Sequence, residues 1–280
     1  MFEILSKEVL NESISKMTLK APNIAKSVLP GQFIILRVDK FGERIPLTVF
    51  NYSRENETID IIYQKVGATT LKLDQKNAGD SILDVVGPLG KSTDITGYKK
   101  AIVVSGGVGG AISYPLARAI KENGAYTAII SGFRNKDMII LENEMKNISD
   151  YFEMVTDDGS NGNKGFVTDA LQKLLERDSS YDVVITIGPL PMMKAVCDIT
   201  KKFNIKTIVS MNSIMIDGTG MCGGCRLTVG GKVKFACIDG PDFDGHQVDF
   251  AESMIRGRMF ANEEKIAREK YCNLYKGVKL

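Results

Sequence analysis

Three of the five cysteines lie close together in the last third of the chain. Cys222 and Cys225 are separated by two residues, and Cys237 follows after eleven more. Thiolates bind zinc and iron–sulfur clusters, and both kinds of site usually take four protein ligands. The spacing therefore predicts a metal site that still needs a fourth ligand.

An aspartate occupies the place where that ligand is expected. Plant-type two-iron clusters use two cysteines with four residues between them, a third after two more residues, and a distant fourth. On this template the three cysteines take the last three places, and the first place falls on Asp217. We therefore predict a [2Fe–2S] cluster bound by Asp217, Cys222, Cys225 and Cys237.

A hairpin pattern gives independent support for this ligand set. The run CRLTVGGKVKFAC reads as two strands joined by a tight turn at 230–231. This register places Cys225 opposite Ala236, with Cys237 one diagonal step away, within about 5–8 Å. The hairpin should therefore bring two of the thiols together.

Other interpretations of the cysteines remain open. A structural zinc could use the same four residues, His246 could complete the set, or the loop could hold no metal. The odd number of cysteines and their clustering argue against a disulfide framework. Cys197 lies in an amphipathic helical pattern typical of a buried, inert thiol, and Cys272 is assigned no role.

A glycine-rich loop predicts a dinucleotide site. The run VVSGGVGGAIS at 103–113 follows a strand pattern and precedes a helix pattern. Glycines at such a turn let the backbone approach a diphosphate, and the helix N-terminus supplies N–H donors. We expect Gly107, Val108, Gly109 and Gly110 to contact NAD(H), although a tight turn without a ligand would have the same pattern.

Further candidate nucleotide contacts follow other strands of the same predicted sheet. Gly188 and Pro189 are expected on the nicotinamide side, and Asp157 and Asp158 near polar groups of the dinucleotide, unless these aspartates form only a solvated turn. Arg134 follows the second strand and could favour a 2′-phosphate, so the choice between NADH and NADPH stays open.

The elements that would position these sites fall into four parts. Residues 1–97 contain six short alternating runs, typical of a six-stranded antiparallel barrel, interrupted by a short helix at 67–76. Residues 98–215 alternate apolar strands with amphipathic helices, which predicts a doubly wound parallel sheet. Residues 216–249 form the cluster segment, and 250–280 form a helical tail.

Length and composition set broad limits. A chain of 280 residues suggests two domains with a small appendage. A net charge of +2 gives no electrostatic footprint for nucleic acid, and no stretch approaches 18 apolar residues. We therefore expect a cytoplasmic protein without a membrane span.

Motifs in the barrel and the sheet identify a family. The runs RIPLTVF at 44–50 and GATT at 67–70, followed by GGVGG and GPLPMM, resemble the ferredoxin-NADP reductase superfamily. One departure is Ile112, which stands where that family usually has a proline. The resemblance implies that the barrel binds FAD through Arg44, Pro46, Leu47, Thr48, Gly67, Thr69 and Thr70.

The cluster segment narrows the resemblance. DGTGMCGGCR and FACIDGPDFDGHQVDF are similar to small subunits of the electron-bifurcating NADH-dependent reduced ferredoxin:NADP oxidoreductases and to sulfide dehydrogenase subunits. Electron-transfer subunits of dihydroorotate dehydrogenase are related but normally have cysteine in the first ligand place. The resemblance implies that Asp217 is a cluster ligand. It also implies a larger flavin/[4Fe–4S] partner, similar to the glutamate synthase small subunit, that binds NADPH and serves ferredoxin.

Together these motifs predict an electron-transfer subunit. A nicotinamide gives up two electrons as a hydride and a two-iron cluster accepts one at a time, so FAD must stand between them. No paired carboxylates or nucleophile suggest an acid/base catalyst, and we assign no catalytic residue. The alternatives are a dihydroorotate dehydrogenase or sulfide dehydrogenase subunit and, in another class, a non-enzymatic regulator that binds nucleotide and zinc.

Overall fold

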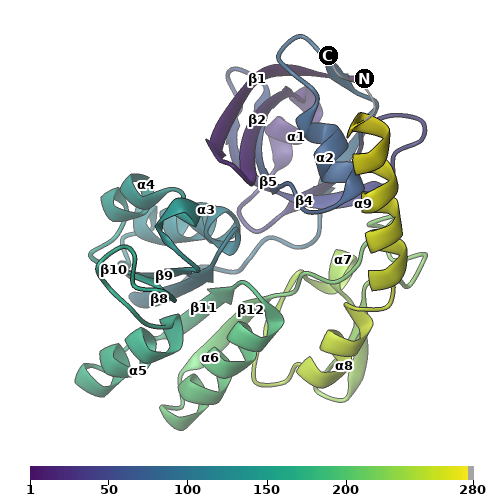
Figure 1. The fold of residues 1–280 in the computed structure, drawn as a ribbon. Helices are drawn as coiled ribbons and strands as arrows, with labels where there is room; N and C mark the ends of the chain where they lie inside the picture. Colours follow the sequence, from purple (N-terminus) through teal and green to yellow (C-terminus); the bar gives the residue numbers. More distant parts are fainter. Residues whose placement is uncertain (277–280) are drawn as a thin grey trace.

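The computed structural model describes residues 1–276 and begins with an antiparallel barrel (Figure 1). Its sheet has the strand order β6-β1-β2-β5-β4-β3-β7. Alternate side chains such as Met17 and Leu19 point inward and are fully buried, as the period of two requires. The elements are β1 (Phe2–Asn11), β2 (Ile14–Lys20), α1 (Pro22–Ser27), β3 (Phe33–Arg37), β4 (Arg44–Ser53), β5 (Thr58–Gln64), α2 (Ala68–Asp74), β6 (Ser81–Ile82) and β7 (Asp84–Leu89).

The last predicted strand of the barrel is divided in two. The run at 81–90 forms β6, which pairs with β1, and β7, which pairs with β3 at the other end of the sheet. One short segment therefore brings the two edges together and nearly closes the barrel. The helix expected at 67–76 is α2, whereas α1 was not predicted.

The second sheet has the order β10-β9-β8-β11-β12-β15, and its first five strands are parallel. Val103 of β8 packs with α3 and α4, whereas its neighbours Ile102 and Val104 pack with α5 and α6. Burial on both faces explains why this strand is continuously apolar. The elements are β8 (Lys100–Gly106), α3 (Gly109–Glu122), β9 (Tyr126–Phe133), α4 (Glu142–Asn147), β10 (Tyr151–Thr156), α5 (Val167–Arg177), β11 (Val183–Ile187), α6 (Leu190–Lys202) and β12 (Lys206–Ser210).

The cysteine-containing segment is built onto this second sheet. Its β15 pairs antiparallel with β12, so the sheet is not purely parallel as the pattern predicted. A helix from the tail, α9, runs back to the barrel and lies beside α2 (Figure 1). The elements are β13 (Arg226–Val229), β14 (Lys232–Phe235), α7 (Ala236–Asp239), β15 (Asp242–Asp244), α8 (Phe250–Arg256) and α9 (Ala261–Lys276). No helix within residues 1–276 is long and apolar enough to cross a membrane.

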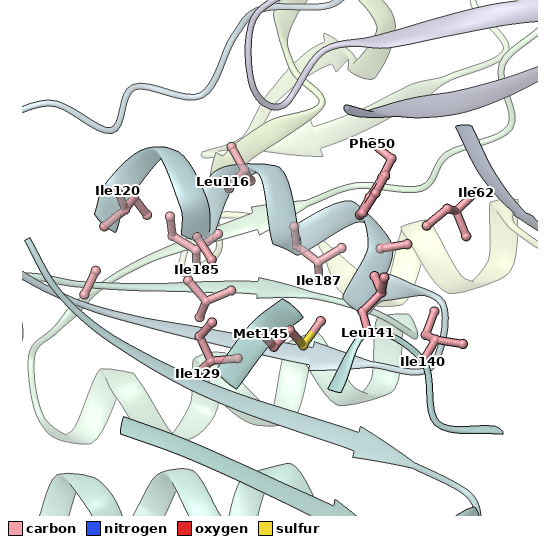
Figure 2. Packing of buried hydrophobic residues seen from close by; sticks show 14 of the residues in the cluster. Phe50, Ile62, Leu116, Ile120, Ile129, Ile140, Leu141, Met145, Ile185 and Ile187 are labelled. Carbon is pink, nitrogen blue, oxygen red and sulfur yellow. The ribbon is translucent and has the colours of Figure 1, made fainter. Parts of the chain in front are cut away.

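The barrel and the second sheet share a hydrophobic interface. Phe50 and Ile62 of the barrel extend the core that surrounds Leu116 of α3 (Figure 2). The Phe50 ring stacks on Tyr114 with centroids 5.2 Å apart. This apolar contact packs the two domains against each other.

Hydrogen bonds at residues 240–242 join the barrel linker, the second sheet and the cysteine-containing segment. The Asp242 carboxyl, in β15, accepts a hydrogen bond from Thr93 in the linker that follows the barrel. Nearby, the Lys91 N–H donates to the Gly240 carbonyl (2.7 Å), and the Met211 N–H at the end of β12 donates to the Pro241 carbonyl (2.9 Å). Burial raises the pKa of Asp242.

Candidate functional site

The hairpin brings two thiols together as predicted. β13 and β14 pair in the expected register, and the Ala236 N–H donates to the Cys225 carbonyl (3.2 Å). The sulfur atoms of Cys225 and Cys237 lie 3.2 Å apart, and both side chains are buried. Burial and the neighbouring thiol raise the pKa of Cys237 to about 12, so metal binding at this pair must displace a proton.

The other two predicted ligands form a second pair. The Asp217 carboxylate accepts hydrogen bonds from the N–H groups of Thr219 (2.9 Å) and Cys222 (2.8 Å). These bonds lower the pKa of Asp217 and keep it anionic. The Cys222 sulfur is exposed and accepts a hydrogen bond from the Gly224 N–H (3.4 Å).

The two pairs match the number of protein ligands that a two-iron cluster takes. Among the residues described, no three or more His, Cys, Asp or Glu side chains converge on a position for one metal ion. A tetrahedral zinc needs four converging ligands, whereas each iron of a two-iron cluster takes only two from the protein. The arrangement therefore supports the proposed [2Fe–2S] ligand set.

The histidine and the other two cysteines lie elsewhere in the fold. His246 Nε2 lies 3.0 Å from Thr200 Oγ1 on α6, so its ring is held against that helix. Cys197 is buried, and burial raises its pKa to about 12, in keeping with an inert thiol. Cys272 is half-buried on α9.

An unpaired strand edge marks the expected FAD site. The first half of β4, Arg44–Thr48, pairs with β3, whereas β5 pairs only with the second half, from Val49 onward. Pro46 therefore occupies a half-strand with one free edge, where its missing N–H costs least. This free edge leaves backbone groups available for a flat ligand.

The two barrel motifs meet at this edge. The Thr69 hydroxyl, in the first turn of α2, donates to Glu43 Oε2 (3.1 Å), directly before β4. The Thr70 hydroxyl accepts from the Gly67 N–H (3.0 Å) and so caps α2.

At the other end of α2, Asp74 accepts from Tyr63 (3.0 Å) and anchors the helix on the barrel. Arg44, the residue after Glu43, is exposed.

The glycine loop and the GPLPMM run also lie together. β8 and β11 are neighbouring strands, and a Cβ placed on Gly188 would lie 3.1 Å from the Gly106 nitrogen. At Gly109 an added Cβ would lie 2.4 Å from the Ile187 carbonyl oxygen, so α3 begins in close contact with β11. The chain order reverses between these strands, and ligands of open α/β sheets bind at such a switch point.

Gly107 is the glycine that leaves room for a ligand. Its φ is +57°, and an added Cβ would meet no protein atom within 4 Å. Arg134 follows β9 and Asp157 follows β10, so both lie farther along the same edge, and both are exposed. Asp158 accepts from the Ser160 N–H (2.9 Å), as expected for a solvated turn.

Comparison with known proteins agrees with this arrangement. Residues 212–249 match the family described as the iron-sulfur cluster binding domain of dihydroorotate dehydrogenase B, and 103–198 match the oxidoreductase NAD-binding domain. A Thermotoga maritima homologue of the dihydroorotate dehydrogenase B (NAD(+)) electron transfer subunit is 44% identical, over 96% of this chain and 95% of its own length. The chain belongs to the dihydroorotate dehydrogenase B electron-transfer subunit family.

Other members and neighbours extend the comparison. The electron transfer subunit from Bacillus pumilus is 32% identical over 88% of this chain and 96% of its own length. A chain in the structure of NADH-dependent reduced ferredoxin-NADP oxidoreductase is 42% identical, with a TM-score of 0.91 and coverage of 97% of this chain and 98% of that one. A ferredoxin reductase of carbazole 1,9a-dioxygenase, at 18% identity and a TM-score of 0.61, shares the fold.

These matches confirm the predicted family, fold class and kind of protein. As a member of this electron-transfer subunit family, the chain is part of an oxidoreductase and binds NAD(H), FAD and an iron–sulfur group. The individual ligand residues stay predictions. Two residues at these sites could not be found from the sequence. Glu43 accepts a hydrogen bond from Thr69, 26 positions away, and Arg256 donates one to the Gly224 carbonyl, 32 positions away. No local pattern marks either contact.

Proposed function

We propose that this chain carries electrons between NAD(H), FAD and a [2Fe–2S] cluster and on to a larger flavin/[4Fe–4S] subunit that handles NADPH and ferredoxin. The observation that carries the proposal is the similarity to a chain of NADH-dependent reduced ferredoxin-NADP oxidoreductase, at 42% identity over 97% of the chain. That structure was reported for flavin-based electron bifurcation. The first ligand place is Asp217, whereas electron-transfer subunits of dihydroorotate dehydrogenase normally have cysteine there, and this difference also favours the proposal.

Each part of the chain has a separate task in this proposal. FAD, when bound, exchanges a hydride with nicotinamide and single electrons with the cluster. Arg44, Thr48 and the first turn of α2 would hold its diphosphate, and Gly107 with Gly188 would admit the dinucleotide at the adjacent sheet edge. The contact of Phe50 with α3 packs the two domains that carry these edges against each other.

A second candidate is the electron-transfer subunit of a dihydroorotate dehydrogenase. The match of residues 212–249 to that enzyme's cluster-binding domain favours it. The two candidates share the cofactors of this chain and differ in the partner. The partner therefore decides between them.

Isolation of the native complex tests the proposal. A tagged chain should co-purify with a subunit that contains flavin and [4Fe–4S] clusters, and the complex should oxidise NADPH with NAD⁺ and ferredoxin as acceptors. A complex that oxidises dihydroorotate would instead establish the second candidate. A colourless chain that contains zinc and no flavin would exclude both.

Substitution of Arg44 tests the FAD site. We expect Arg44→Ala to raise the FAD dissociation constant about tenfold or more, because a charged hydrogen bond to a phosphate is lost. Fluorescence titration of the flavin-depleted protein measures it. Arg54→Ala is the control, since Arg54 is also exposed on the barrel but stacks on Tyr52 (4.9 Å). Equal affinity in both variants would contradict the assignment.

Exposed apolar side chains next to the cluster ligands form the proposed partner surface. Met221 is 89% exposed between Asp217 and Cys222, and Ile216 and Ile238 are 50% and 43% exposed. Electron transfer to another subunit requires close approach at this place, and buried apolar anchors dominate binding energy at interfaces.

We expect Met221→Glu to weaken partner binding about tenfold or more while leaving iron and FAD contents unchanged. Val9→Glu, on an exposed apolar residue of β1 in the barrel, is the matched control. Binding of the purified partner to each variant by calorimetry gives the comparison. Normal affinity in Met221→Glu would show that the partner binds at another surface.

A further inference from the structure

A helix after the cluster segment is bonded to the turn that carries two of the proposed ligands. Arg256, the last residue of α8, donates from Nη2 to the Gly224 carbonyl (3.1 Å). Gly224 lies between Cys222 and Cys225, and its own N–H donates to the Cys222 sulfur (3.4 Å). The guanidinium is therefore one peptide unit away from the ligand set.

The start of α8 is itself fixed to the hairpin. The Asp249 N–H donates to the Thr228 carbonyl (2.9 Å) of β13, and the Thr228 N–H donates to Glu252 Oε2 (3.0 Å). Asp249 also caps α8 by accepting from the Glu252 N–H (2.9 Å). The hairpin that brings Cys225 to Cys237 thus also determines where Arg256 lies.

The guanidinium of Arg256 is incompletely paired in the described part of the chain. Its Nε is buried without a hydrogen-bond partner. Glu252, one turn earlier on α8, has its carboxylate on the Thr228 N–H, and no carboxylate forms an ion pair with Arg256 there. The other charged groups around the adjoining cavity, Arg226 and Arg258, are also cationic.

Arg256 is half-buried, and partial desolvation of an unpaired charge is unfavourable unless an anion lies close by. A cluster held by one carboxylate and three thiolates would bring such negative charge next to the Cys222–Cys225 turn. A cavity of about 260 Å³, lined in part by Met211, Gly224 and Arg256, borders the same turn. Next to this open space, the bond from Arg256 to the Gly224 carbonyl adds to the bond between the Cys222 N–H and Asp217 in holding the turn.

We propose that Arg256 is a positioning residue of the cluster site, which braces the Cys222–Cys225 turn and makes the reduced cluster easier to form. This inference rests on the proposed [2Fe–2S] site. Reduction adds one negative charge to the cluster, and a fixed cation nearby favours the more negative state.

Arg256→Gln and Arg256→Lys test the inference, with Arg258→Gln as the matched control. Arg258 is exposed two residues later and borders the same cavity, so loss of its charge should be screened by solvent. For each purified variant, EPR-monitored redox titration gives the midpoint potential of the cluster, and iron and FAD contents report on assembly. Reduction of the bound FAD by NADH reports on the rest of the chain.

We expect Arg256→Gln to shift the midpoint potential to a more negative value, so that the ratio of reduced to oxidised cluster at the wild-type midpoint falls about tenfold. Arg256→Lys should keep most of the wild-type potential, and Arg258→Gln all of it. If Arg256→Gln loses iron, retention of the cluster and its potential in Arg256→Lys supports the inference. An unchanged potential in Arg256→Gln, or loss of the cluster in both variants, overturns it. Absence of a two-iron signal from the wild-type chain would instead refute the proposed function.

Discussion

Asp217→Ala is expected to purify with its normal FAD content but with little bound iron. The substitution removes one of four proposed ligands and leaves the first iron with Cys222 alone from the protein. It also removes two acceptors for backbone N–H groups, which hold the loop at Thr219 and Cys222. Iron analysis and the EPR signal of the reduced protein measure the loss.

Two further variants separate ligation from loop stability. Asp217→Cys restores a ligand of the usual plant type and should assemble a cluster with an altered potential. Asp94→Ala removes a comparable turn, in which an exposed carboxylate accepts from the backbone N–H two residues on (3.1 Å), and should leave iron unchanged. A normal EPR signal in Asp217→Ala would show that another residue is the fourth ligand.

Gly107→Ala is expected to raise the KM for NADH at least tenfold while leaving FAD and iron in place. The added methyl group would enter space that is empty of protein atoms and that a diphosphate needs. The positive φ of +57° adds strain of about 1 kcal/mol. Stopped-flow reduction of the bound FAD by NADH measures the effect.

Gly124→Ala provides the control for backbone strain. Gly124 also has a positive φ (+84°) and also has no atom within 4 Å of an added Cβ, but it follows α3 at the opposite end from the glycine loop. It should lose similar stability in thermal unfolding and keep the wild-type KM. Equal kinetic defects in the two variants would show that strain, and not the ligand site, is responsible.

The local features of the cluster segment could be predicted because they depend on residues close together in the chain. A two-residue turn at 230–231 allows few registers, so the approach of Cys225 to Cys237 followed from the pattern and was confirmed. The strand and helix patterns of the second sheet were confirmed for the same reason. Each pattern reports which side of one element is buried.

Other features needed the whole fold. The run at 81–90 is divided because its two ends meet opposite edges of the barrel, and β15 joins the second sheet because β12 left an edge open. The free edge of β4 depends on where β5 stops pairing. No pattern within these segments reports on such distant partners.

By itself, the sequence determined the kinds of cofactor, the spacing of Asp217 with the three cysteines, and the alternation that defines each strand and helix. The tertiary structure decided which groups surround them: Glu43 beside Thr69, Asp242 at the junction of three parts, and Arg256 on the Gly224 carbonyl. The physical reason is the distance along the chain over which each effect acts. Covalent spacing and periodicity act over a few residues, whereas hydrogen bonds and charges act through space, between residues whose positions only the complete packing brings together.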